Sequence, residues 1–336
     1  MNDQKARLGI VLAPFAALPA AEFVAVARET EARGYHMAWT GEASGYDAIS
    51  LMTTIAGHTE RLHVGSAVLP VQTRTPVVLG QTAATLNHLA PGRVVLGIGL
   101  SSRVIVGDWH GLTFAPAIRQ IREAVQVIRM VASGERVTFE GKFYRVKNFR
   151  LTAPPPARPV RVVLAALGPE MLELAGEIAD GVVLNWIPPE TVPVSIQHLE
   201  GGARKAGRTL ADFEIASFIR TCVTDDAAGA CEALARDITG YATVDVYASF
   251  FRGAGFADEV DAVNAAWRAG DRAGAVKQVS RRFLDALGVV GPGAFCRERI
   301  AEFARAGLTQ PVIVPFAPGA GADARASQLR TLRTFP

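Results

Sequence analysis

The sequence predicts a single (β/α)8 barrel with a helical insertion before the last strand. One pattern recurs along the chain: a helical segment, then a glycine, then a short run of β-branched residues. Examples are LAPGRVVLGIG (89 to 99) and IADGVVLNW (178 to 186). Glycine ends helices because it adopts the left-handed conformation without a Cβ clash. The apolar runs are typical of parallel strands buried on both faces. α/β barrels reach the length of this chain as one domain, so we expect a single domain over residues 1–336.

Eight apolar runs mark the expected strands of this barrel. Helical segments separate them, and eight strands alternating with helices favour a closed barrel over an open sheet. The expected strands lie near residues 7–12, 36–40, 62–68, 94–98, 160–166, 181–185, 213–221 and 312–316.

Three segments between the strands have a distinct pattern. Residues 116–134 place apolar side chains at three- and four-residue spacing, which predicts a helix with one face on the barrel and with Glu123 among its intervening polar positions. Residues 135–159 read as a hairpin followed by a stiff proline connector. Residues 222–290 are rich in alanine and predict a mainly helical insertion.

Composition and charge exclude several classes of protein. The 35 Lys and Arg residues against 32 Asp and Glu give a net charge of +3, too small to indicate a nucleic-acid partner. No segment has the roughly 18 apolar residues of a membrane span. The three cysteines form no CxxC pair and are typical of reduced thiols, so we expect a cytoplasmic protein. The basic and apolar stretch from Lys5 to Ala20 also resembles an export leader, although Pro14 and Pro19 interrupt it.

The chemistry of such a barrel belongs at the carboxyl ends of its strands. The segments found there are Thr40-Gly41-Glu42, VLPVQTRTP (68 to 76), GIGLSS (97 to 102), ALGPEM (166 to 171) and Asn185-Trp186. They combine small residues, hydroxyl groups and aromatic rings, and a phosphate or a planar ring suits them better than a metal. We therefore expect a small-molecule ligand.

Other kinds of site find little support. The six histidines show no HxH or HExxH spacing, so no metal site is expected. No GxSxG motif is present for a serine hydrolase. The string GIGLSS lacks the third glycine of a dinucleotide-binding fingerprint.

The expected fifth strand passes abruptly into a helix. The strand breaks at Leu167-Gly168, and Pro169 begins the helix, which is a position that proline favours. The first amides of a helix have no acceptor within it, and glycine leaves them uncovered, so an anionic group suits this point. An ordinary strand-to-helix turn is the alternative explanation.

Four motifs together resemble the bacterial luciferase-like superfamily, and within it the branch related to methylenetetrahydromethanopterin reductase that uses coenzyme F420. These motifs are HVGSAVLPVQTRTP (63 to 76), QTAATLNHLAPGRVVLGIG (81 to 99), GDWHG (107 to 111) and AALGPEMLELAGEIADGVVLNW (165 to 186), and the likeness runs from about residue 7 to 320. The resemblance implies the same barrel and insertion.

The resemblance also implies a set of cofactor-binding residues. The cofactor's phosphate would lie at the turn after the fifth strand, and a bulge with a non-prolyl cis peptide between Ala67 and Val68 would support the tricyclic ring. The cofactor-binding residues expected on this basis are Ala67, Val68, Gly99, Ser101, Ala166, Leu167, Gly168, Pro169, Glu170, Met171 and Asn185.

Glu42 and His110 are the expected catalytic residues. Glu42 matches the acidic position after the second strand, and His110 is able to donate a proton. Ala43 replaces a histidine of the branch's sugar-phosphate dehydrogenases, and Ser101 and Ser102 stand where those relatives carry a glutamate. A deazaflavin-dependent reductase is therefore favoured over such a dehydrogenase.

Two other functions stay open from the sequence. One is a monooxygenase that uses flavin mononucleotide (FMN), and the other is a barrel that binds a cofactor without catalysis. A homodimer or higher homo-oligomer is expected, because relatives associate and the insertion carries several aromatic residues. These residues are Tyr247, Phe250, Phe251, Phe256 and Trp267.

Overall fold

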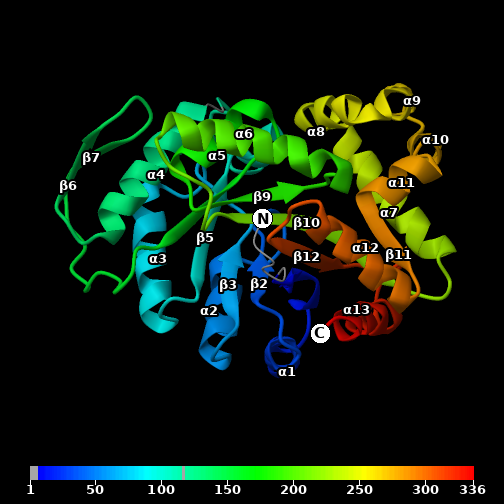
Figure 1. Ribbon diagram of the computed structural model, residues 1–336, viewed down its shortest axis with the longest axis horizontal. Coiled ribbons are helices and arrows are strands. Elements are labelled where there is room, and N and C mark those ends of the chain that lie inside the picture. Colours follow the sequence, from blue (N-terminus) through cyan, green and yellow to red (C-terminus); the bar gives the residue numbers. More distant parts are fainter. Residues whose placement is uncertain (1–6, 116–117) are drawn as a thin grey trace.

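Eight parallel strands close into a barrel in the computed structural model, which describes residues 7–115 and 118–336 (Figure 1). Each strand pairs with its neighbours in the order β10, β12, β1, β2, β3, β5, β8 and β9, and the pairing of β9 with β10 closes the ring. The predicted barrel is confirmed. The strands are β1 (Gly9–Val11), β2 (Met37–Thr40), β3 (His63–Ser66), β5 (Val94–Gly99), β8 (Arg161–Ala165), β9 (Gly181–Asn185), β10 (Glu214–Val223) and β12 (Gln310–Pro315).

Helices cover the outside of this barrel, as the alternating pattern predicts. The two residues that precede Ile118 in the helix predicted over 116–134 lie outside the described residues. The helices that alternate with barrel strands are α1 (Ala20–Ala32), α2 (Ala48–His58), α3 (Pro76–Leu89), α4 (Ile118–Ala132), α5 (Pro169–Ile178), α6 (Val192–Lys205), α12 (Gly293–Arg305) and α13 (Ala322–Thr334).

The barrel interior is filled by side chains that point inward from alternate strand positions. The indole Nε1 of Trp39 donates to Gln310 Oε1 at 2.7 Å, which satisfies its polar atom inside the barrel. A Cβ atom at Gly65 would lie 2.6 Å from the Trp39 ring, so this strand must carry glycine beside the tryptophan. The interior cluster consists of Met37, Trp39, Val95, Val163, Val183, Ala216 and Val312.

The insertion forms a second hydrophobic core beside β10. Figure 1 shows its helices, yellow to orange, gathered at one side of the barrel. Its helices are α7 (Ala228–Ala242), α8 (Asp245–Phe251), α9 (Ala257–Arg268), α10 (Arg272–Lys277) and α11 (Arg281–Leu287). Phe251 and Phe256 are buried in this core, and Tyr247, Phe250 and Trp267 pack against it. The aromatic residues that suggested a subunit contact thus stabilise the insertion itself, and the homo-oligomer stays a prediction.

The range predicted as a mainly helical insertion, 222–290, ends in a short strand that was not expected, β11 (Gly288–Gly291). β11 pairs with residues 220–223 of β10, beyond the point where the pairing of β10 with β9 ends at Phe218. Two β-branched residues, Val289 and Val290, are too short a run to be recognised in sequence. The strand forms because β10 extends past its neighbour and leaves an edge to be paired.

The predicted hairpin is present, with strands β6 (Val137–Glu140) and β7 (Arg145–Phe149). It projects from the barrel on the side away from the insertion (Figure 1). Glu123, one of the intervening polar positions of helix α4, is buried. Its carboxylate accepts the backbone amides of Lys142 and Phe143, at 3.0 and 2.8 Å, and so holds the turn of the hairpin.

Two histidines at the amino-terminal end of the barrel make stability depend on pH. The rings of His36 and His63 lie 4.3 Å apart. Burial, followed by the charge of His63, lowers the pKa of His36 to about 4, and burial lowers the pKa of His63. The unfolded chain, with histidine pKa values near 6.5, therefore binds more protons than the folded protein between pH 6.5 and 4.

We expect the free energy of unfolding to fall as the pH drops through this window. The loss between pH 7 and 5 should be on the order of 1–2 kcal/mol, a value reduced for the partial exposure of both rings. Urea denaturation at several pH values measures it. A His36→Gln/His63→Gln variant should show a flatter profile, with His88→Gln as control. An equally steep pH profile in the double variant would show that His36 and His63 do not cause the pH dependence of the unfolding free energy.

Candidate functional site

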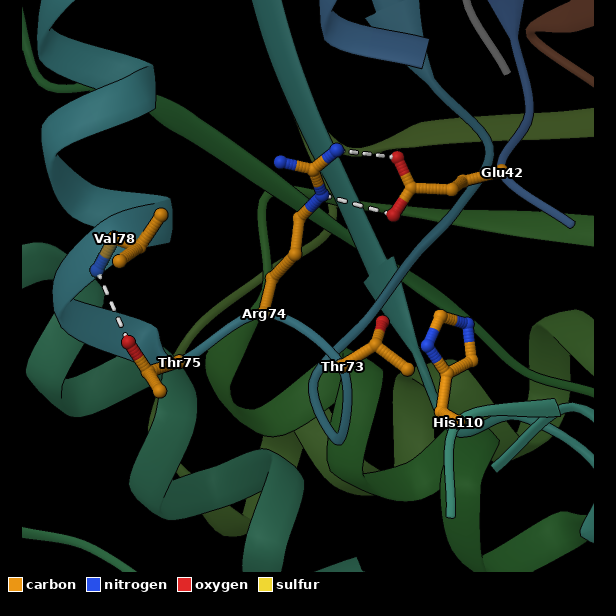
Figure 2. A pocket seen from close by; sticks show the side chains of 6 residues that line it. All are labelled: Glu42, Thr73, Arg74, Thr75, Val78 and His110. Atoms are coloured by element: carbon orange, nitrogen blue, oxygen red, sulfur yellow. Dashed lines mark hydrogen bonds and ion pairs between the residues drawn. The ribbon is translucent and has the colours of Figure 1, made fainter. Parts of the chain in front are cut away.

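A pocket of about 350 Å³ lies at the carboxyl ends of the barrel strands (Figure 2). The residues that line it come from the segments that follow β2, β4 (Leu69–Pro70) and β5. Two residues predicted to be catalytic, Glu42 and His110, lie in this one pocket although 68 positions separate them. The pocket is lined by Glu42, Thr73, Arg74, Thr75, Val78 and His110.

Arg74 organises one side of the pocket. Its Nε donates to Glu42 Oε1 at 2.8 Å and its Nη2 to Glu42 Oε2 at 2.7 Å, which is a bidentate pair (Figure 2). The same Nη2 also contacts the carboxylate of Asp47, which caps helix α2 by accepting the Ser50 amide at 2.7 Å. The hydrogen bond to Glu42 raises the pKa of Arg74. The guanidinium is thus held between two carboxylates.

His110 ends a six-residue π-helical turn, Val104–Trp109, that follows β5. Ser102 holds the beginning of this turn, because its Oγ accepts the amide of Ile105 at 3.3 Å. The amide of His110 donates to the carbonyl of Ile105 at 3.2 Å, which places the imidazole beside the pocket while the side chain stays exposed. Single-turn π-helices recur at functional sites.

The third strand is interrupted by a cis peptide bond between Ala67 and Val68, as predicted. The interruption separates β3 from β4. The amide of Ala67 donates to the carbonyl of Thr40, and a Cβ atom at Gly99 would lie 2.9 Å from Val68 Cγ2. A Cβ atom at Gly41 would lie 3.1 Å from the carbonyl oxygen of Ala67. Glycines at 41 and 99 therefore make room for the bulge.

A tyrosine from the hairpin holds the segment that follows β4, and sequence reasoning missed it. The hydroxyl of Tyr144 donates to the carbonyl of Val71 at 3.0 Å and accepts from the side chain of Gln120 at 3.2 Å. Glu123 holds the hairpin turn that carries Tyr144. No local motif marks this contact, because it joins positions 73 residues apart.

The turn after β8 has the predicted helix start. Pro169 is the first residue of α5, and Gly168 precedes it with φ −81° and ψ 158°, an ordinary extended conformation. A Cβ atom at Gly168 would meet no other atom within 4 Å. The helix therefore does not require glycine here, and its amino-terminal amides are open to an approaching group. Ala166 is buried, whereas Pro169 and Glu170 are exposed.

Asn185 ends β9, at another part of the barrel mouth from the turn after β8, and its side chain already makes two hydrogen bonds. Its Nδ2 donates to the hydroxyl of Tyr247 at 2.8 Å, and its Oδ1 accepts a hydrogen bond from Arg220. The predicted contact between Asn185 and a cofactor stays a prediction. Arg220, which the sequence did not single out, is the cation at the centre of this group.

The residues present fit a phosphate-bearing cofactor with a flat ring. The open amides at the start of α5 suit an anion, because the positive end of the helix dipole and the unpaired N–H groups both attract negative charge there. The Ala67–Val68 bulge, for which Gly41 and Gly99 make room, suits the flat ring. Within residues 7–115 and 118–336 no group of three or more His, Cys, Asp and Glu side chains is placed to hold a metal ion.

Fold and site together define a (β/α)8 barrel with its pocket at the carboxyl ends of the strands. The family model for luciferase-like monooxygenases matches residues 7–310, and the chain belongs to this family. It is therefore an enzyme rather than a non-catalytic binding barrel. None of the helices in the part of the chain that the structure describes has the length and hydropathy to cross a membrane.

Relatives point to one branch of this family. A Mycobacterium tuberculosis protein provisionally named a coenzyme F420-dependent oxidoreductase is 28% identical, with 91% of this chain and 94% of that one covered. The 5,10-methylenetetrahydromethanopterin reductase of Archaeoglobus fulgidus is 28% identical over 84% of this chain and 86% of its own. The solved F420-dependent tetrahydromethanopterin reductase of Methanopyrus kandleri has the same fold, with TM-score 0.80, 24% identity and 97% of both chains covered.

Proposed function

We propose that the protein is a coenzyme F420-dependent reductase of a small organic acceptor. The observation that carries the proposal is the arrangement of three features around one barrel mouth. The Ala67–Val68 bulge, the open helix start at Gly168 and the pocket of Glu42 and His110 all lie at the carboxyl ends of the strands. Relatives named for the same cofactor support it.

The chain would hold the cofactor at two places. The backbone N–H groups of Gly168, Glu170 and Met171 suit its phosphate, since Pro169 has none, and Ala166 and Leu167 lie beside them. The bulge at Ala67 and Val68 suits its ring, with Gly99 and Ser101 nearby. When bound, the deazaflavin supplies a hydride. The protein contributes orientation, exclusion of water and a proton.

His110 is the better proton donor of the two predicted catalytic residues. Both oxygens of Glu42 already accept N–H groups of Arg74, so its carboxylate is an acceptor and not a donor in this arrangement. His110 has an exposed imidazole in the same pocket. We infer that Glu42 positions Arg74, and that His110 protonates the acceptor as it is reduced.

The reductase direction is part of this proposal. Ala43, Ser101 and Ser102 provide no imidazole or carboxylate at the positions where the sugar-phosphate dehydrogenases of the branch carry them. A cytoplasmic location agrees with the unpaired cysteines at 222, 231 and 296. The association into a homodimer belongs to this proposal as well, and light scattering measures it.

Purified protein is expected to bind coenzyme F420 far more tightly than FMN, because its relatives are named for the deazaflavin. Fluorescence titration with each cofactor measures both affinities. Since a deazaflavin carries carbon in place of the ring nitrogen that assists the reaction of a reduced flavin with oxygen, turnover should be equal with and without air. Tight FMN binding with a requirement for oxygen would replace the proposal with a monooxygenase.

A further inference from the structure

Arg220 is a nearly buried cation at the barrel mouth whose charge is only partly balanced. Its side chain is 11% exposed, and β10 carries it on the same inward face as Ala216 and Phe218, since side chains alternate along a strand. Among the described residues, Arg220 forms an ion pair with Asp237. The Asp237 carboxylate lies 3.7 Å from Arg220 Nε, and the Asp237 side chain is 52% exposed. An ion pair this long and this solvated stabilises the arginine weakly.

One flat face of the guanidinium is stacked on Trp186, and its edge makes a single hydrogen bond to a side chain. The carbon Cζ of Arg220 lies 3.9 Å from the centre of the Trp186 ring and 5.5 Å from that of Tyr241. Its Nη1 donates to Asn185 Oδ1. An arginine has five N–H donors, so this one hydrogen bond leaves most of the in-plane donors for another acceptor.

Trp186 adds a second unsatisfied donor to the same cluster. Its side chain is fully buried, and its indole Nε1 makes no hydrogen bond to any described residue. Its backbone has φ 57°, a left-handed conformation that a tryptophan rarely adopts. Such conformations cluster at ligand-binding sites, where the surrounding structure enforces them.

The position of β10 relates this cluster to the candidate active site. Around the eight-stranded ring β3 is the third strand and β10 the seventh, so the two lie on opposite sides of the barrel. A molecule between them would contact the Ala67–Val68 bulge on one side and Arg220 on the other. Arg220 therefore faces the place that the proposed function leaves for the substrate.

We propose that Arg220 recognises a carboxylate of the substrate, an inference that rests on the proposed reductase function. A planar guanidinium stacked on an indole presents its edge to an acceptor, and a carboxylate matches that edge with two parallel hydrogen bonds. Asn185 and Tyr247 act as positioning residues, because the Tyr247 hydroxyl holds the amide that holds Arg220. The substrate class is then an unsaturated organic acid.

Benzoate and its neutral isostere benzamide test the proposal without cofactor or turnover. Thermal shift and tryptophan fluorescence, at constant ionic strength, measure their binding to the wild-type protein and to Arg220→Met. The wild type should bind benzoate at least tenfold more tightly than benzamide, and Arg220→Met should lose this preference by about tenfold to a hundredfold. Equal binding of both probes to the wild type would overturn the proposal.

Two further variants control for charge and folding. Arg236→Met removes one positive charge from an exposed position on α7, where Arg236 pairs with Glu232, and should leave benzoate binding unchanged. Asp237→Asn removes the competing carboxylate and should tighten benzoate binding several-fold. If Arg220→Met does not fold, an Asp237→Asn protein with unaltered or weakened benzoate binding counts against the proposal.

Coenzyme F420 titration of the same variants separates this inference from the proposed function. Arg220→Met should bind the cofactor as the wild type does, because β10 lies across the barrel from the bulge and β9 separates it from β8, the strand that leads into α5. Preserved F420 binding with no preference for benzoate refutes the carboxylate site alone. Benzoate binding through Arg220 without F420 binding refutes the reductase proposal and leaves an anion site at the mouth.

Discussion

Replacing Gly168 with valine is expected to weaken coenzyme F420 binding by roughly a hundredfold and to leave the barrel folded. Charge-assisted hydrogen bonds are each worth about 1.5–3 kcal/mol, so blocking one or two amides at the start of α5 accounts for this loss. The fold should persist because Gly168 has an ordinary φ of −81° and open space around its Cα. Fluorescence titration and circular dichroism measure the two effects.

A matched control shows whether the effect is local. Gly57→Val adds the same side chain at an exposed position of α2 where a Cβ atom also has no neighbour within 4 Å. It should bind F420 as the wild type does. Unchanged affinity in Gly168→Val would remove the phosphate assignment, and an unfolded variant would show that the turn depends on glycine for a reason other than its φ.

Replacing His110 with glutamine is expected to lower kcat by roughly 10²- to 10⁴-fold while cofactor affinity changes little. This is the range typical of a lost general acid, since glutamine keeps hydrogen bonding but has no proton to transfer. Stopped-flow oxidation of the reduced cofactor by an accepted substrate measures the rate. Normal turnover in His110→Gln would make His110 only a surface residue beside the pocket.

Glu42 and Arg74 are expected to act as a unit in the same assay. Glu42→Gln keeps the shape of the side chain but removes one of the two carboxylates that hold Arg74. If Glu42 works by positioning Arg74, then Glu42→Gln and Arg74→Met should cause similar losses, and the double variant should be no worse than either. Additive losses would instead give Glu42 a direct part in proton transfer.

The sequence predicted the repeated parts of the fold better than its exceptions. Seven of the expected strands correspond to one continuous strand each, because buried apolar runs bounded by glycine have a local signature. The third, expected over 62–68, ends at Ser66 before the cis peptide, and β4 follows beyond the expected range. Residue pattern alone does not encode this bond, which the family resemblance supplied. β11 was missed because its partner, the free edge of β10, exists only in the folded barrel.

Only those site residues that follow strands could be predicted from the sequence. Glu42, His110 and Gly168 follow strands, and strand ends in a barrel meet at one mouth. Arg220 lies within strand β10 and not after it. In sequence, an arginine among the apolar residues of a strand looks the same as an arginine at the edge of a sheet, so Arg220 was not singled out. Tyr144 acts through its hydroxyl on Val71, and such long-range contacts leave no trace in local spacing.

The first strand of the barrel pairs with the last one to be synthesised. β1 is bonded to β2 on one side and to β12 on the other, where Gly9 faces Val312 across about 300 positions of chain. On the ribosome, β1 therefore emerges early and keeps an unpaired edge until translation is nearly complete. Open strand edges promote misassembly, and closure over such a separation is slow. Cells that make this protein quickly are expected to depend on chaperones that shield the edge of β1 until β12 arrives.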